Sequence, residues 1–202
     1  MNFLSIESVT DNPSIALYID DLCVSSRFMN SNSSELASEI KGIILDNKID
    51  INTLDYIAIT IGPGSYTGVR VGLSLAQGLA YSLNIPLLPI HTMDILYSLA
   101  SQDNHINKLV GFPAYKDKVL HFTITQIKHD KKYNLKLSNI QDLEGEAIYG
   151  VGLDKYKDVV DYKKIDFSAE SIGEYSIVNY KLLCCDDIGN IAPIYLDEFL
   201  VS

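Results

Sequence analysis

The sequence predicts an α/β fold of two lobes, each a mixed sheet with flanking helices. Two observations carry this prediction. A strand, a glycine-rich turn, a helix and a second strand follow one another over residues 56–92, which is the pattern of a βαβ unit. A set of three short strands, followed later by a further strand and a helix, occurs twice along the 202 residues. We therefore expect a first lobe over residues 1–100 and a smaller second lobe over residues 101–202.

The first lobe begins with three apolar-rich runs, at residues 3–9, 13–20 and 22–29, which are separated by short polar turns. Such short connections predict an antiparallel meander. A helix is predicted over residues 33–47, because four apolar residues there share one face: Leu36, Ile40, Ile43 and Ile44.

The centre of the first lobe is the βαβ unit. Residues 56–61 are short, β-branched and apolar at nearly every position, as expected of a strand that is buried on both faces. Residues 69–84 are rich in helix-tolerant Val, Leu and Ala, and residues 85–90 form the next apolar run. Another helix is predicted over residues 92–101.

The second lobe repeats the pattern of the first. Residues 109–113, 118–128 and 133–140 predict a second meander, and residues 148–152 a short strand that enters a glycine turn. A helix is predicted over residues 168–183.

The turn after the first central strand has two interpretations. Its glycines, with two hydroxyl residues and an arginine, would place exposed backbone N–H groups at a helix N-terminus, where anions bind: Gly62, Gly64, Ser65, Thr67, Gly68 and Arg70. Alternatively, the glycines only permit a tight turn while a hydroxyl side chain caps the helix. The spacing is neither that of a P-loop nor that of a dinucleotide-binding loop.

Small residues recur every four positions along the helix that follows: Gly68, Gly72, Ala76 and Ala80. A stripe without bulk lets another helix approach closely, inside the subunit or across an interface. We expect a partner interface built from both first-lobe helices, with these residues: Leu36, Ile40, Ile43, Gly72, Ala76 and Ala80. The alternative is that this face packs against the sheet of its own lobe.

Residues 62–73, read with Ala76-Gln-Gly-Leu-Ala and Asn84-Ile-Pro-Leu, closely resemble the TsaB (YeaZ) family. The resemblance is strong over residues 55–95 and weaker elsewhere. It implies a two-lobed actin-like (ASKHA, ribonuclease H-like) fold with duplicated lobes.

The resemblance also implies a function. Such proteins are non-catalytic dimerisation subunits in the transfer of threonylcarbamoyl to adenosine 37 of tRNA. They pair with the catalytic subunit TsaD through the first-lobe helices, and the ATPase TsaE joins them. The resemblance thus implies no catalytic residue and no cofactor within the chain, with ATP or ADP only at the partner interface. It leaves open whether the isolated chain forms a homodimer.

The composition agrees with a protein that meets tRNA only through a complex. A formal net charge of −10 argues against a broad basic surface for RNA phosphates. Of the two arginines, Arg27 and Arg70, the second is a candidate for bidentate recognition, or else is solvated or paired with a carboxylate. The absence of a signal peptide and of a long apolar run predicts a soluble cytoplasmic protein without a membrane segment.

Residues for catalysis are missing from the sequence. The end of the first strand reads Glu7-Ser8-Val9-Thr10, without the Asp and glycine with which related kinases hold metal and phosphate. The four histidines are too dispersed for a zinc hydrolase signature, and no serine lies in a nucleophile elbow. Two alternatives, an ATP-dependent small-molecule kinase and a glycoprotease-like peptidase, are therefore not favoured. The adjacent Cys184 and Cys185 are expected to pack rather than to be redox-active or to bind metal.

Four positions depart from what is usual in the family. Glu7 stands in place of an aspartate, Ser33 in place of a histidine, Pro113 in place of an aspartate, and Asp197 in place of an arginine. These departures argue against a small-molecule role for the cleft between the lobes.

Overall fold

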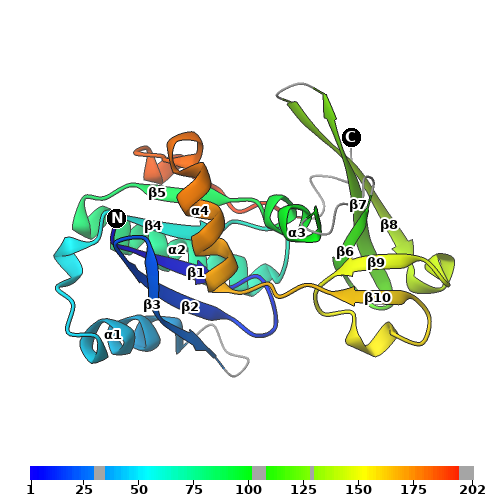
Figure 1. Ribbon diagram of the computed structural model, residues 1–202, viewed down its shortest axis with the longest axis horizontal. Coiled ribbons are helices and arrows are strands. Elements are labelled where there is room, and N and C mark those ends of the chain that lie inside the picture. Colours follow the sequence, from blue (N-terminus) through cyan, green and yellow to red (C-terminus); the bar gives the residue numbers. More distant parts are fainter. Residues whose placement is uncertain (30–34, 102–107, 128–129, 196–202) are drawn as a thin grey trace. The chain divides into compact units, whose positions relative to one another are not determined.

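The computed structural model describes residues 1–29, 35–101, 108–127 and 130–195, and only the backbone of residues 124–127 and 130–132. Their contacts divide into two units, Met1–Ile95 with Phe167–Tyr195, and Leu96–Asp166. Each unit is built on one five-stranded mixed sheet (Figure 1). The prediction of an α/β fold with two mixed sheets and flanking helices is confirmed.

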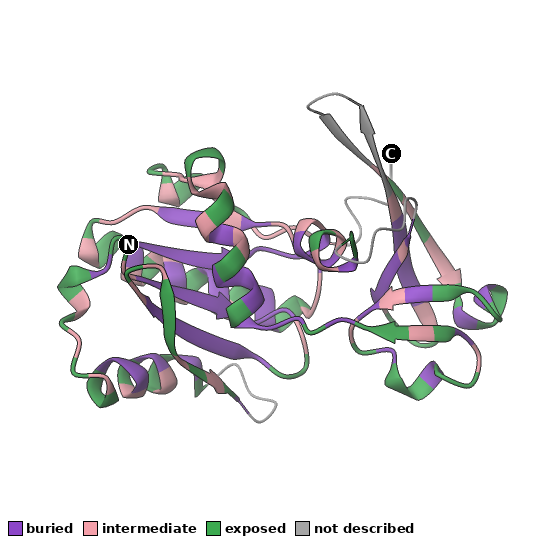
Figure 2. Cartoon of the chain, in the orientation of Figure 1, coloured by how far each residue is buried: buried purple, intermediate pink, exposed green. Residues whose placement is uncertain are grey.

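The first sheet has the strand order β3-β2-β1-β4-β5. Its meander is antiparallel, and the two later strands add parallel to the first. The strands are β1 (Phe3–Glu7), β2 (Ser14–Ile19), β3 (Leu22–Phe28), β4 (Tyr56–Thr60) and β5 (Leu87–Ile90). The three inner strands are almost wholly buried, whereas β3 at the edge is largely exposed (Figure 2). Burial of the inner strands on both faces explains their continuous apolar sequences.

Helices cover both faces of the first sheet. On one face lie α1 (Leu36–Asp46) and α2 (Tyr66–Leu83), packed on the side chains that alternate to that side, such as Leu4, Ile6 and Ile57. On the other face lies α4 (Ala169–Leu183), which contacts β1, β2, β4 and β5. Both predicted first-lobe helices are confirmed, but α2 begins at Tyr66, three residues before the predicted start, because Ser65 caps it.

The helix α4 corrects the predicted lobe boundary. The sequence assigns it to a second lobe of residues 101–202, whereas its contacts place it in the first unit. It packs on stacked aromatic rings, with centroid separations of 4.4 Å for Phe3 to Tyr18 and 4.3 Å for Phe3 to Tyr56. The Tyr56 hydroxyl lies 3.0 Å from Ser176 Oγ. Gly173 allows this approach, since a Cβ there would overlap the Tyr18 ring.

The second sheet has the order β10-β9-β6-β7-β8, the same arrangement of a meander and two parallel strands as the first. Its strands are β6 (Leu109–Pro113), β7 (Lys118–Ile127), β8 (Asp130–Asn139), β9 (Ala147–Gly150) and β10 (Asp161–Lys164). Short 3₁₀ turns, η3 (Ile140–Leu143) and η4 (Asp154–Tyr156), stand where the first unit has helices. The sequence did not predict β10, a polar edge strand without an apolar run.

The remaining helix, α3 (Thr92–Ser101), has the bounds that the sequence predicts, and the boundary between the two units falls within it. None of the helices in the described part of the chain has the length and apolar character needed to cross a membrane.

Candidate functional site

The glycine-rich turn between β4 and α2 is held by hydrogen bonds from three separate segments. The Ser65 N–H donates to the Val9 carbonyl at 2.7 Å, and the Ile194 N–H donates to the Ile61 carbonyl at 2.7 Å. The Thr92 N–H donates to the carbonyl of Gly62, which has a φ of +104° and precedes a cis peptide bond to Pro63. The turn therefore lies where the ends of β1 and β5 meet the last described residues of the chain.

The glycines of this turn make room for the protein's own backbone. A Cβ at Gly62 would overlap the Ile194 carbonyl, and one at Gly68 would overlap the Ser8 carbonyl. At Gly64 a Cβ would lie 2.6 Å from the Val9 carbonyl oxygen. The Ser65 Oγ accepts a hydrogen bond from the Gly68 N–H at 3.2 Å and so caps α2. These contacts favour the interpretation as a tight turn with a cap over the interpretation as an anion site.

Arg70 lies on the exposed side of the same helix end, between two tyrosines. Its Nε donates to the Tyr195 hydroxyl at 2.6 Å. Its guanidinium carbon lies 3.9 Å from the centroid of the Tyr66 ring and 5.2 Å from that of Tyr195. The hydrogen bond to Tyr195 is the main reason why the pKa of Arg70 is raised. Arg70 thus anchors residues 191–195 to α2 through stacking, rather than pairing with a carboxylate of the described residues.

The stripe of small residues on α2 is not an outer face, which corrects the predicted interface. Ala76 and Ala80 are fully buried, and a Cβ at Gly72 would overlap the side chain of Ser8 and lie 3.4 Å from Ile59. The stripe therefore lets α2 pack closely on β1 and β4 of its own unit. The apolar residues predicted from α1 are core residues too: Leu36 (0% exposed), Ile40 (3%) and Ile43 (0%).

An exposed apolar groove lies beside that buried face, between α1 and α2. It has a volume of about 260 Å³, and Lys41 is the one charged residue that lines it. Of the predicted interface residues only Ile40 contributes to it. The complete lining is Ala37, Ile40, Lys41, Ile44, Leu45, Ile51, Leu75 and Leu79. Leu45 is 63% exposed. An uncovered apolar groove of this kind is a candidate site of association. We call these eight residues the α1–α2 groove.

Sequence periodicity alone did not identify most of this groove. Leu45, Leu75 and Leu79 fall beside the stripes that point into the core, so they resemble incidental surface residues. Their one signal in the sequence is that both helices carry more apolar residues than their buried faces require.

The end of β1 carries a buried carboxyl group at Glu7. One of its oxygens accepts from the N–H groups of Val9 and Thr10, at 2.6 and 2.8 Å, and the other lies 2.7 Å from Thr10 Oγ1. Burial raises the pKa of Glu7 to about 7. The carboxyl group thus closes the turn after β1 and has little capacity left for a metal ion. In the described part of the chain no group of three His, Cys, Asp or Glu residues could hold one.

The remaining residues considered from the sequence, Pro113, Cys185 and His121, contact neighbouring parts of the protein. Pro113 ends β6 and lies against Gly152, whose φ of +71° turns the chain after β9. Cys185 exchanges two backbone hydrogen bonds of 3.1 Å with Leu87, at the edge of β5, and the three cysteines form no disulfide. His121 Nε2 lies 2.9 Å from Ser138 Oγ. Ser33 and Asp197 lie outside the described residues.

Comparisons with known sequences agree on one family. A family model described as TsaD, tRNA N6-adenosine threonylcarbamoyltransferase, matches residues 29–152. A tRNA threonylcarbamoyladenosine biosynthesis protein TsaB of Buchnera aphidicola is 33% identical over 46% of this chain and 45% of that protein. The Bacillus subtilis protein of the same name is 31% identical over 59% of this chain and 53% of that protein. A tRNA N6-adenosine threonylcarbamoyltransferase of Chlorobium limicola is 28% identical over 75% of this chain and 49% of that protein. The chain spans about half the length of these curated relatives.

The fold has a counterpart among solved structures. YeaZ from Pseudomonas aeruginosa superimposes with a TM-score of 0.73 over 96% of this chain and 100% of that one, at 17% identity. A second Pseudomonas aeruginosa structure, titled as similar to peptidase YEAZ, gives the same TM-score at 18% identity. At such identities the likeness concerns the fold alone, and it agrees with the expected pair of mixed α/β units.

Proposed function

Because this chain belongs to the TsaD family, in the group that carries the names TsaB and YeaZ, we propose that it is a non-catalytic partner subunit in the biosynthesis of threonylcarbamoyladenosine in tRNA. The observation that carries the proposal is the α1–α2 groove, an apolar surface left uncovered in the free chain.

The first support comes from Glu7 and from the glycine-rich turn, where related kinases would hold a metal ion and phosphate. Both carboxyl oxygens of Glu7 accept hydrogen bonds from Val9 or Thr10. The space beside the glycines of the turn at residues 62–68 is occupied by the backbone of residues 8, 9 and 194. A metal ion or a phosphate group would have to displace these contacts. The kinase and peptidase alternatives are accordingly not favoured.

The second support is the energy that the groove offers to a partner. Burying one leucine or isoleucine side chain contributes roughly 1.5–3 kcal/mol. Leu45, Leu75 and Leu79 are only partly covered in the free chain, so an apolar helix face laid between α1 and α2 would bury all three. We propose that a TsaD-type catalytic subunit docks here. The same groove would serve a homodimer of the isolated chain.

The remaining partners follow from the same proposal. A TsaE-type ATPase would join the assembled pair, with ATP or ADP held only where the subunits meet. The tRNA would be bound by the complex rather than by this chain alone.

Reconstitution tests this function. Purified chain, TsaD-type and TsaE-type proteins of the same organism are mixed with unmodified tRNA, ATP and the threonylcarbamoyl donor. The modified nucleoside is then measured by mass spectrometry. We expect product from the complete mixture, at least tenfold less without the chain, and neither ATP turnover nor casein cleavage by the chain alone. Equal product with and without the chain would contradict the proposal.

A further inference from the structure

Positive charge is concentrated in the second unit. Residues 96–166 hold eleven of the fourteen lysines beside ten acidic residues, a net charge of +1, which becomes −1 when Asp197 and Glu198 of residues 196–202 are counted with them. Residues 1–95 and 167–195 hold five basic and fourteen acidic residues, a net charge of −9. A polyanion approaching this acidic protein would therefore meet the least repulsion at the second unit.

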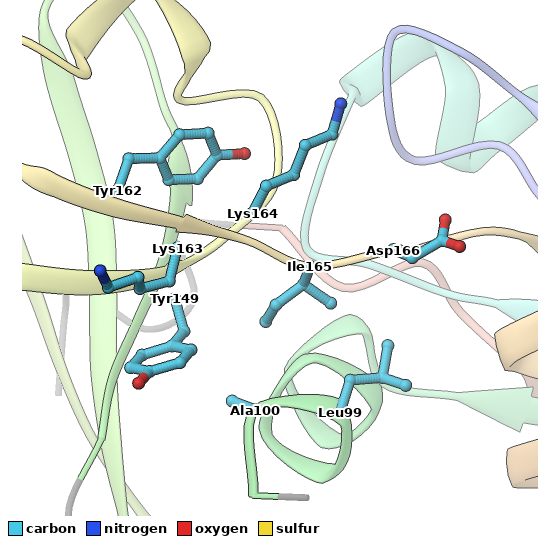
Figure 3. A pocket seen from close by; sticks show the side chains of 8 residues that line it. All are labelled: Leu99, Ala100, Tyr149, Tyr162, Lys163, Lys164, Ile165 and Asp166. Atoms are coloured by element: carbon cyan, nitrogen blue, oxygen red, sulfur yellow. The ribbon is translucent and has the colours of Figure 1, made fainter. Parts of the chain in front are cut away.

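A pocket of about 620 Å³ lies in that unit, where β9 and β10 meet the end of α3 (Figure 3). Leu99, Ala100 and Ile165 give it an apolar floor, and Asp166 lies at its edge. Two tyrosine–lysine pairs flank β10. Figure 3 shows Lys163 on the same side of the strand as Tyr149, and Lys164 on the side of Tyr162.

The aromatic rings of this pocket are held in place. Lys108, which is only 5% exposed, places its ammonium 4.2 Å from the centroid of the Tyr149 ring and donates to the Ala100 carbonyl. The Tyr162 hydroxyl donates to the Gly150 carbonyl at 3.2 Å. Lys163 forms an ion pair with Asp161 at 2.8 Å, and its side chain is 47% exposed. Fixed rings beside exposed ammonium groups are the arrangement that binds unpaired nucleotides.

We propose that this pocket binds nucleotides of a single-stranded RNA segment, the bases against Tyr149 and Tyr162 and the phosphates at Lys163 and Lys164. The proposal rests on the proposed function, in which tRNA is the substrate of the assembled complex. The ligand that this pocket recognises is a nucleoside phosphate, so a free nucleotide is the alternative to a nucleotide within RNA. Two tyrosine–lysine pairs on opposite sides of one strand suit consecutive nucleotides better than a single one.

An NMR titration of the isolated ¹⁵N-labelled chain at 50 mM salt tests this site. The probes are AMP, a five-nucleotide single-stranded RNA and an acidic peptide of equal charge. We expect amide shifts within residues 99–101 and 147–166 for the RNA, with weaker binding of AMP. Raising the salt concentration to 200 mM should weaken RNA binding about sevenfold if two phosphates are neutralised. Saturable binding of AMP with equal or higher affinity would also support the pocket and assign it to a free nucleotide.

Two charge-matched double variants give the control. K163E/K164E should lose RNA binding by at least tenfold, whereas K155E/K157E, which changes the same net charge in the same unit outside the pocket lining, should keep it. Y149A should weaken binding about tenfold by removing one stacking surface. Equal losses in both double variants, stronger binding of the acidic peptide than of the RNA, or no shifts with any probe would overturn the proposal. Capture of a TsaD-type protein by the wild-type chain, measured in parallel, reports on the proposed function separately.

Discussion

The protonation of Glu7 depends on its buried surroundings. Its pKa, about 7 in the fold against an ordinary value of 4.5, means that burial favours the neutral acid. The stabilisation associated with protonation is fully present below pH 4.5 and is lost as the pH rises through 7. The shift corresponds to about 3 kcal/mol.

Glu7→Gln is therefore expected to raise the free energy of unfolding at pH 8 by roughly 1–3 kcal/mol. The amide keeps an acceptor for Val9 and Thr10 and gains a donor for Thr10 Oγ1. Urea unfolding at pH 4, 6 and 8 measures this, and the advantage should disappear at pH 4. Glu144→Gln, at an exposed position of the second unit, is the control. A variant less stable than wild type at pH 8 would show that Glu7 is bound as a carboxylate.

Two glycines of the helix α2 have different surroundings. Gly68 faces the Ser8 carbonyl, whereas Gly78, on the same helix, has open space where its Cβ would be. Gly68→Ala is expected to lower the free energy of unfolding by about 1–3 kcal/mol through overpacking. Gly78→Ala should raise it by about 0.5–1 kcal/mol, because alanine restricts the unfolded chain. Urea unfolding compares the two. Similar effects at both positions would mean that the stripe does not pack on β1.

Helices and strands were predictable from the sequence wherever a local pattern of apolar and turn residues determines them. The two meanders, the βαβ unit and α4 follow from apolar periodicity and turn residues. The polar β10 has no such pattern and forms because β9 offers it a parallel neighbour. The position of α4 depends on rings from Phe3, Tyr18 and Tyr56, more than a hundred residues earlier, and no local signal reports that.

The predicted interface failed for a related reason. Periodicity identifies the face of a helix that is buried, but it does not say what covers it. The stripe at Gly72, Ala76 and Ala80 is covered by the sheet of its own unit, so an arginine at Ala76 would enter the core. The exposed apolar residues of the α1–α2 groove become a candidate site only when both helices are placed side by side.

The charge distribution over the whole molecule limits how tightly the isolated chain binds RNA. With a net charge of −10, and −9 of it in the first unit, the isolated chain is expected to bind tRNA no more tightly than about 100 μM at physiological salt. A mobility-shift titration measures this. A salt-sensitive complex at micromolar concentration would mean that the chain contacts tRNA without a partner. Weak local binding at the tyrosine–lysine pocket is compatible with the expected result.

The claim that a TsaD-type subunit docks at the α1–α2 groove can be decided by a binding titration. Leu45→Arg places a charge in the groove, and Leu182→Arg makes the same change on α4, where Leu182 is 81% exposed. Calorimetric titration with a TsaD-type protein gives both affinities, and circular dichroism verifies that both variants are folded. We expect Leu45→Arg to weaken binding at least a hundredfold, about 3 kcal/mol, and Leu182→Arg to bind as wild type does. Unchanged affinity in folded Leu45→Arg, or an equal loss in both variants, would contradict the claim.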